Sequence, residues 1–355
     1  MTPAALIGYV LVPLFGVVMV ISPIASRPTI PFGVRVPPAH LTAPVIRRER
    51  RGYQWRTAVV AVCATAVLIG IDSHASWPSR LILIGEILAD LGCYWWAHQR
   101  ITKVKAAEGW FAGQQRQTVV ADTSWRTQPQ HFPVAWLVPA AVVIVATVIV
   151  GILRYPQLPP YLASSGHPVA TSPANAFATI FAQLYVTGIG SGLLALVYRS
   201  RPDLDTADPT ASLRSYRKAL GVFARATLIM LAGVDLTLLL NALQQWQVYR
   251  LPSYGAALIL LPVALGLIAL LTTAIRAGRE RARATPTTSA TDRDDDRFWK
   301  AGLIYVNRDD PAILVNARFA FGWTANFGNP AAWLLIAGVI AVPVGLVIIK
   351  FATGT

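Results

Sequence analysis

Apolar residues in this chain come in long, nearly uncharged runs that are separated by polar segments. A helix rises about 1.5 Å per residue, so a run of about 20 apolar residues crosses the roughly 30 Å of hydrocarbon in a bilayer. The runs predict eight transmembrane helices, at about residues 4–24, 57–71, 81–97, 134–153, 177–198, 219–243, 254–275 and 330–351. We therefore predict an all-α fold, a polytopic membrane helix bundle in which residues 1–281 hold the first seven spans.

The loops between these runs differ in charge. The alternate segments 25–56, 98–133, 199–218 and 276–329 hold 26 of the 31 Lys and Arg residues, against four in the other loops and the tail. Cytoplasmic loops keep positive charge, so these four segments are expected to face the cytoplasm. Both termini are then predicted to be extracytoplasmic, and the first span has no basic residue before it, as expected of an anchor rather than a cleaved signal peptide.

Composition agrees with this class, because 54% of the residues are apolar and only 14% are charged. The net charge of +14 could suggest a nucleic-acid partner, but the basic residues are confined to certain loops and no nucleic acid is expected. Cys63 and Cys93 lie in apolar runs, so no disulfide is expected between them. The five histidines are scattered without ligand spacing, and we predict no metal and no cofactor.

Four charged residues interrupt the apolar runs. Glu86 and Asp90 are four residues apart and share one face of the third predicted helix, while Arg225 and Asp235 fall in the sixth. Charged groups in a bilayer are costly and commonly mark a site, and we expect Arg225 to pair with Asp90 rather than with Glu86. A proton or cation pathway or a polar pocket is one interpretation, and a buried ion pair or hydrogen-bond network that fixes helix packing is the other.

Two loops stand out. Residues 282–296 are rich in Thr, Ser, Arg and Asp and are predicted to be a flexible cytoplasmic linker. Residues 297–329 interleave aromatic and basic residues, which suits a cytoplasmic flap on the membrane face, with a tight turn at 307–311. The residues that we single out in this segment are Trp299, Lys300, Tyr305, Asn307, Asp309, Asp310, Pro311, Arg318, Trp323 and Asn326.

The external segment Tyr155–Ala174 contains five prolines. Proline fixes φ and lacks a backbone donor, so this loop is predicted to be extended and turn-rich, neither helix nor buried sheet.

Residues 296–333, which begin DRFWKAGLIYVNRDDP and end GWTANFGNPAAW, closely resemble the C-terminal module of an uncharacterised bacterial membrane-protein family, a domain of unknown function. Residues 32–37 and the basic stretch that ends at Tyr53 resemble the N-terminal loop motif of the same proteins. This resemblance implies a multi-pass protein of the bacterial plasma membrane and implies no established activity.

Relatives of this family often carry an external proline motif shared with SdpI-type membrane proteins, which act as immunity proteins against a secreted toxin and as signal receptors. Here Pro156, Pro159, Gly166 and Pro168 are similarly placed, while the His-Phe-Asn of the motif is absent. The first hypothesis is therefore a non-enzymatic protein that binds an external peptide or small ligand through 155–174 and responds through 297–330. An ion-coupled transporter that uses the intramembrane acids is the alternative, and a membrane-embedded enzyme is the third.

Overall fold

The computed structural model describes residues 3–71, 77–111, 130–164, 167–200, 209–249, 255–283, 293, 295–319 and 322–353. Within these ranges the chain is mostly helical, with eight long helices and one short one. The long helices are α1 (Pro3–Ala25), α2 (Pro44–Gly70), α3 (Trp77–Ala107), α5 (Val138–Arg154), α7 (Ala178–Arg199), α8 (Pro209–Gln245), α9 (Gly255–Arg283) and α10 (Pro330–Thr353), and the short one is α6 (Pro173–Ala176).

A long helix covers each of the eight predicted spans, but several helices extend beyond the apolar run. Helix α2 begins at Pro44 rather than near residue 57, and α8 begins at Pro209 rather than near 219. Hydropathy marks only the apolar part of a helix, whereas Arg, Glu, Gln and Ala are good helix formers that continue it into water. In both helices a proline sits at the first helical position, where its missing N–H has no intrahelical partner to lose.

Five helices are long and apolar enough to cross a membrane: Pro44–Gly70, Val134–Gln157, Ala178–Arg199, Leu213–Gln245 and Leu258–Ala277. Leu11–Ala25 and Pro330–Gly345 are shorter apolar stretches of helix. Large apolar side chains point outward from these helices, such as Val62 at 69% and Leu334 at 75% exposure. This surface is compatible with a membrane protein, while the eight-span count and the side on which each end lies stay predictions.

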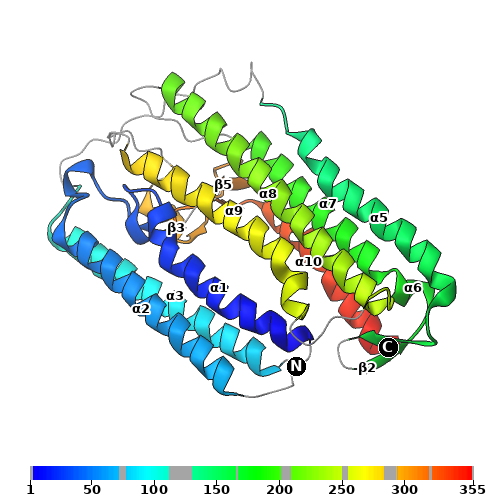
Figure 1. The fold of residues 1–355 in the computed structure, drawn as a ribbon. Coiled ribbons are helices and arrows are strands. Elements are labelled where there is room, and N and C mark those ends of the chain that lie inside the picture. Colours follow the sequence, from blue (N-terminus) through cyan, green and yellow to red (C-terminus); the bar gives the residue numbers. More distant parts are fainter. Residues whose placement is uncertain are drawn as a thin grey trace.

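The helices form two groups joined through α9 (Figure 1). Helices α1, α2 and α3 pack against one another, α5 and α7 pack against α8, and α9 contacts both α1 and α8. Helices α8 and α9 approach closely through glycines, since a Cβ on Gly233 would lie 2.6 Å from the Pro262 carbonyl oxygen and one on Gly266 would lie 2.7 Å from the Met230 Cα. Small residues let two backbones pack at short range where hydrocarbon gives no hydrophobic drive.

The described residues are mainly helical, as predicted, but they also include three short antiparallel strand pairs in the loops. They pair β1 (Tyr161–Ser164) with β2 (His167–Ala170), β3 (Trp299–Lys300) with β4 (Ile304–Tyr305), and β5 (Leu314–Asn316) with β6 (Trp323–Ala325). The segment 155–174 was expected to hold neither helix nor buried sheet, but α6 begins within it, and its β1–β2 hairpin, largely exposed at Tyr161, buries Leu162 fully. Backbone groups outside the helices need partners, and in these loops they find them across hairpins.

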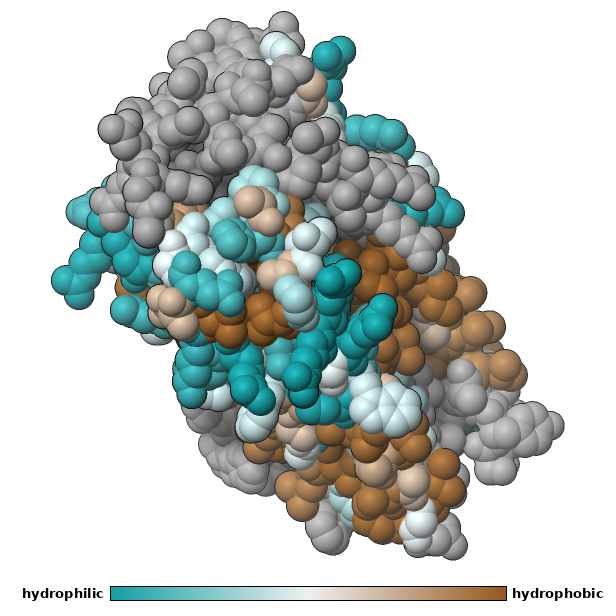
Figure 2. Space-filling view, turned by 90° about the vertical axis from the view of Figure 1, so that its left-hand side faces the viewer, coloured by the Kyte–Doolittle hydropathy of each residue, from teal (hydrophilic) through white to brown (hydrophobic). Residues whose placement is uncertain are grey.

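The two ends of the bundle are built differently. Both termini, β2 and α6 lie at one end in Figure 1, and the segment with β3 and β5 lies at the other. Figure 2 shows hydrophobic residues over the lower part of one side and hydrophilic residues gathered above them, toward the β3–β6 end. Of the predicted linker, residues 284–292 and 294 lie outside the described residues, 282 and 283 belong to α9, and Arg293, Asp295 and Asp296 make contacts with the β3–β6 segment.

Candidate functional site

The acids of α3 are enclosed by three helices. Glu86 and Asp90 are each only 2% exposed, and their four carboxyl oxygens have no hydrogen-bond partner among the described residues. On α1, a Cβ at Gly16 would lie 2.9 Å from Glu86 Oε1 and 2.2 Å from the Cβ of Ala61 on α2. The structure therefore places both carboxyls inside the α1–α2–α3 group.

Asp235 belongs to a separate hydrogen-bond network between α5, α7 and α8. Its Oδ2 accepts a hydrogen bond of 2.6 Å from Thr187 Oγ1, and the side chain is fully buried. Gln183 Nε2 donates to the Asp235 backbone carbonyl at 2.8 Å and to Thr147 Oγ1 at 3.0 Å. These contacts connect three helices through uncharged groups and one carboxyl.

The four charged residues that were predicted to lie within spans do not form one cluster. Arg225 is exposed on α8, and neither oxygen of Asp90 has a hydrogen-bond partner among the described residues, so the expected pairing of Arg225 with Asp90 is not formed. In Figure 1, α3 and α8 lie on opposite sides of α9. Helical periodicity gives the face on which a residue lies, but it does not say which helices become neighbours.

The segment Asp296–Asn329, here called the module, has a small core of its own. Trp299, Tyr305 and Val315 are buried together, and the rings of Trp299 and Tyr305 lie 5.1 Å apart. The hairpins β3–β4 and β5–β6 are joined by a bridge between Tyr305 and Asn326. The predicted flap on the membrane face is therefore a folded unit.

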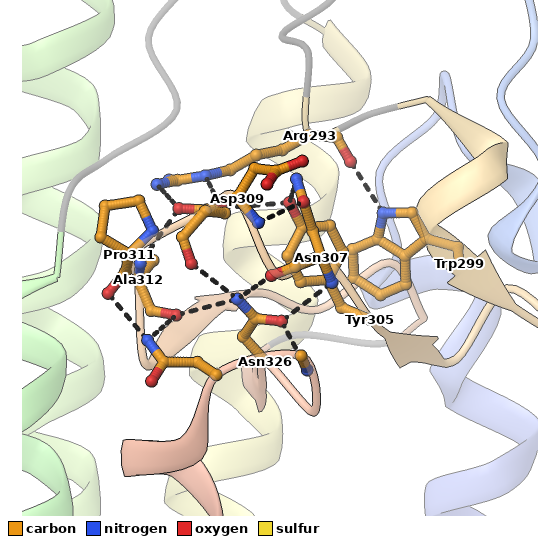
Figure 3. A network of polar contacts seen from close by, with 11 residues as sticks. Arg293, Trp299, Tyr305, Asn307, Asp309, Pro311, Ala312 and Asn326 are labelled. Atoms are coloured by element: carbon orange, nitrogen blue, oxygen red, sulfur yellow. Dashed lines mark hydrogen bonds and ion pairs between the residues drawn. The ribbon is translucent and has the colours of Figure 1, made fainter.

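Asn326 is the hub of the module's hydrogen bonds (Figure 3). Its Nδ2 donates to the backbone carbonyls of Asn307, Asp310 and Ala312, at 2.8, 3.0 and 3.2 Å. Its Oδ1 accepts from the backbone N–H of Asn307 at 3.1 Å and of Gly328 at 3.0 Å. The fully buried amide of Asn326, directly after β6, thus fixes the position of the predicted turn at 307–311.

Asp310 forms the charged part of the same network. Arg293 donates to it through Nε at 2.7 Å and Nη2 at 3.1 Å, and Tyr305 donates its hydroxyl at 3.0 Å. Burial raises the pKa of Asp310, but the hydrogen bonds and the charge of Arg293 outweigh it, so the net pKa lies below the ordinary value. Burial raises the pKa of Tyr305 to about 12, so its hydroxyl stays a donor at neutral pH.

The other residues singled out in the module are divided between its interior and its surface. Trp299 donates its indole N–H to the Arg293 carbonyl at 2.7 Å, and Lys300 and Asp309 are exposed. The Pro311 carbonyl accepts from Asn329 Nδ2 at 3.0 Å. The side chain of Trp323 contacts α8, where its ring lies 5.2 Å from that of Phe223.

Arg318 is buried at the contact between the module and the first helix group. Its Nη1 donates to Asp296 Oδ1 at 2.5 Å and to the Gly33 carbonyl at 2.7 Å, and its guanidinium lies 4.7 Å from the Trp299 ring. Lys105 near the end of α3 donates to the other oxygen of Asp296 at 2.6 Å. Burial raises the pKa of Asp296, but the charges of Arg318 and Lys105 and their hydrogen bonds lower it below the ordinary value.

The loop after α1, which includes Phe32 and Gly33, packs against the module beside Arg318 and Asp296. Gly33 and Gly302 have φ of +74° and +69°, and a Cβ on Gly33 would lie 2.4 Å from the Gly302 carbonyl oxygen. Tyr94 of α3 donates its hydroxyl to the carbonyls of Phe32 and Ala301, at 3.0 and 3.2 Å. The two stretches that carried the sequence resemblance, 32–37 and 296–333, are therefore in direct contact.

Sequence reasoning missed several of these residues. Asn329 caps α10, since its Oδ1 accepts from the backbone N–H of Ala331 at 2.9 Å. Its signal was present, because Asn followed by Pro is a common start of a helix. Lys105, Tyr94 and Arg293 carried no such local signal.

At the opposite end of the bundle, the β1–β2 hairpin rests on α8. Leu162 is fully buried, and Trp246 donates its indole N–H to the carbonyl of Ala176 in α6 at 3.1 Å. The rings of Tyr155 and Phe177, which flank the segment with the hairpin and α6, stack 5.6 Å apart. Among the described residues, no three of His, Cys, Asp and Glu are grouped to hold a metal ion.

One known family matches part of the chain. The match covers residues 308–333, and the family is described as a family of unknown function (DUF5808). These residues run from the turn at Asn307–Pro311 through Asn326 to the first turn of α10. Comparison with curated proteins and with solved structures gave no match.

Proposed function

We propose that this chain is a non-enzymatic membrane receptor of the SdpI type, which binds an external peptide at the β1–β2 hairpin and responds through the module. In this proposal the protein spans a bacterial plasma membrane eight times with both termini outside. Toxin immunity and signal reception are the two roles that such a receptor serves.

The observation that carries the proposal is that α8 touches both ends. At one end Trp246, the first residue after α8, donates its indole N–H to the Ala176 carbonyl of α6, directly after the hairpin, and at the other end Phe223 of α8 packs on Trp323 of the module. A helix of 37 residues is about 55 Å long, which exceeds the thickness of the hydrocarbon. A shift of α8 at the hairpin would therefore be transmitted to the module as a rigid-body movement.

Helix α10 gives a second connection. It begins in the module, where Asn329 caps it, and Tyr185 of α7 donates its hydroxyl to the Val339 carbonyl farther along. Helix α7 follows directly on α6 and the hairpin. The hairpin end is thus connected to the module by α8 through Phe223, and by α7 through its contact with α10.

A peptide suits the hairpin for a backbone reason. Strands β1 and β2 form a sheet of two strands, so an extended peptide can add a third strand at an outer edge. Tyr161, which is 63% exposed, offers an aromatic ring beside that edge.

The test uses an artificial ligand at the hairpin. A short epitope is inserted between Ser164 and His167, the protein is placed in nanodiscs, and an antibody fragment against the epitope is added. We expect amide exchange at residues 299–326 to change on binding, and a Trp246→Phe variant, which lacks the indole N–H, to reduce that change. The same epitope fused to the C-terminus is the control. Unchanged exchange in the module with the fragment bound at the hairpin would refute the proposal.

Ion-coupled transport is a second candidate, favoured by the two α3 acids. Glu86 and Asp90 are buried without a hydrogen-bond partner among the described residues, a costly arrangement for a purely structural role. Asp235 lies in the other helix group, so the candidate pathway uses the α3 pair alone. Proton flux into proteoliposomes that is equal for the native chain and for Glu86→Gln with Asp90→Asn would remove this candidate.

A further inference from the structure

The module-side ends of α2 and α3 carry a mixed surface of basic and tryptophan side chains, here called the basic rim. Its basic members, all exposed, are Arg47, Arg48 and Arg51 of α2 and Arg100 and Lys103 of α3. Its tryptophans are Trp55, Trp95 and Trp96, with exposures of 72%, 47% and 54%. Helices α2 and α3 pack against each other, so these side chains border one continuous surface.

The tryptophans of the rim lie at one level. Trp55 lies about 15 residues, or about 23 Å, before Gly70 at the end of α2. Trp95 lies about 18 residues, or about 27 Å, after Trp77 at the start of α3. Apart from Arg80 near the start of α3, the exposed residues between are apolar, among them Val62 on α2 and Leu88 on α3, at 69% and 63% exposure. An apolar band of nearly bilayer thickness therefore ends at the tryptophans, where amphipathic rings suit the membrane interface.

The basic side chains continue directly from the tryptophans. Arg51 is one helical turn before Trp55 and shares its face, and the Arg100 guanidinium lies 5.5 Å from the Trp96 ring. In Figure 2, on the side that carries α2 and α3, hydrophilic side chains lie next to the hydrophobic surface. The rim thus sits at the depth of lipid headgroups.

No exposed acid offsets this charge within α2 and α3. Glu49, the acid of α2, is buried and pairs with Arg56 at 3.3 Å. Glu86 and Asp90, the acids of α3, are buried too. Glu108, directly after α3, is exposed and accepts the indole N–H of Trp110 at 2.7 Å, so the five basic groups of the rim keep a net positive charge at the headgroup layer.

We propose that the basic rim binds anionic phospholipids through their headgroup phosphates. A guanidinium donates two parallel hydrogen bonds to a phosphate, which suits Arg47, Arg48 and Arg51. The apolar band below the rim accommodates the acyl chains, and the tryptophans cover the glycerol level. A free phosphate would use only the first of these features, so a phospholipid is the ligand that fits the whole surface.

The experiment measures lipid retention by the purified full chain in native mass spectrometry, with phosphatidylglycerol and phosphatidylcholine offered in equal amounts. The native chain should retain phosphatidylglycerol preferentially. The triple variant Arg47→Gln, Arg48→Gln, Arg51→Gln should weaken that preference at least about tenfold, because each basic group near an anionic surface adds to the attraction. Replacing the same three arginines by lysine keeps the charge and should restore part of the preference.

The matched control removes three exposed basic residues of α8, by Arg214→Gln, Lys218→Gln and Arg225→Gln. Its net charge equals that of the rim variant, and it should keep the native preference. Equal loss in both variants would mean that net charge alone attracts the lipid, and unchanged preference in the rim variant would mean that the lipid binds elsewhere. Displacement of the lipid by an equal concentration of inorganic phosphate would show an anion site without acyl contacts. Each of these three results would overturn the proposal.

Discussion

Asn326 shows how a single side chain can fix the conformation of a loop. An amide offers two N–H donors and a carbonyl with two lone pairs, and here both sides are used by backbone groups of the turn at 307–312 and of Gly328. Gly328 must be a glycine, because a Cβ there would lie 2.5 Å from the Asn307 carbonyl carbon. The module's fold therefore depends on polar complementarity more than on its small apolar core.

Replacing Asn326 by Ala should open the module. The change leaves buried backbone carbonyls and N–H groups without partners, at a cost of about 3 kcal/mol or more in the free energy of local opening. Amide exchange at residues 299–326 in nanodiscs measures this opening. Arg308→Ala, at an exposed position of the same turn, is the control and should exchange like the native chain. Native exchange in the Asn326 variant would refute this role.

Acid should loosen the module. The pKa values of Asp310 and Asp296 are lowered in the fold, so their contribution is present above the ordinary aspartate pKa of about 3.9 and is lost as the pH falls through the lowered values. Exchange in the module, corrected for intrinsic rates, should stay constant down to about pH 5 and rise below about pH 4. Asp310→Asn should reduce the size of this acid step, and an undiminished step in that variant would contradict the assignment.

These residues differ in how far the sequence predicts them. The composition of 297–329 was enough to single out Asn326, Asp310 and Arg318. It could not supply their partners, because Arg318 contacts Gly33, which is 285 positions away, and Lys105 contacts Asp296, which is 191 away. A local sequence pattern carries no information about such distant contacts. The only hint was that residues 32–37 and 296–333 resemble parts of the same family.

Among the elements, helices were more predictable than strands. Each apolar run became a helix, since a run of about 20 residues gives a strong signal. The hairpins of the module have strands of two and three residues, which are too short for an alternating pattern to be recognised. The β1–β2 hairpin was not predicted, because the prolines in and before it favour turns and disfavour strands.

The docking of the first loop on the module depends on close backbone approach. Gly33→Ala should weaken it, because alanine is strained at positive φ by roughly 1–3 kcal/mol and its Cβ would contact the Gly302 carbonyl. Amide exchange at residues 296–319 should rise in this variant. Gly338→Ala in α10, where a Cβ meets nothing within 4 Å, is the matched control and should leave the exchange unchanged. Equal exchange in both variants would show that the approach contributes little.

At the scale of the whole molecule, two helix groups are joined through α9, and the first holds Glu86 and Asp90 buried while the second holds Asp235. The sequence predicted that acids lie inside the bundle, but it could not predict which helices surround them, because loop lengths leave many arrangements open. The structure also gives the bundle two unlike ends, with the β1–β2 hairpin at one and the module at the other (Figure 1). A receptor requires these ends to face different compartments.

Site-directed labelling tests this requirement most directly. Cys63 and Cys93 are changed to Ser, and single cysteines are placed at Tyr161 of the hairpin and at Arg308 of the module, both exposed. We expect a membrane-impermeant maleimide to label position 161 in intact cells, and position 308 only after the membrane is permeabilised. Labelling of both positions in intact cells, or of 308 alone, would contradict the receptor account.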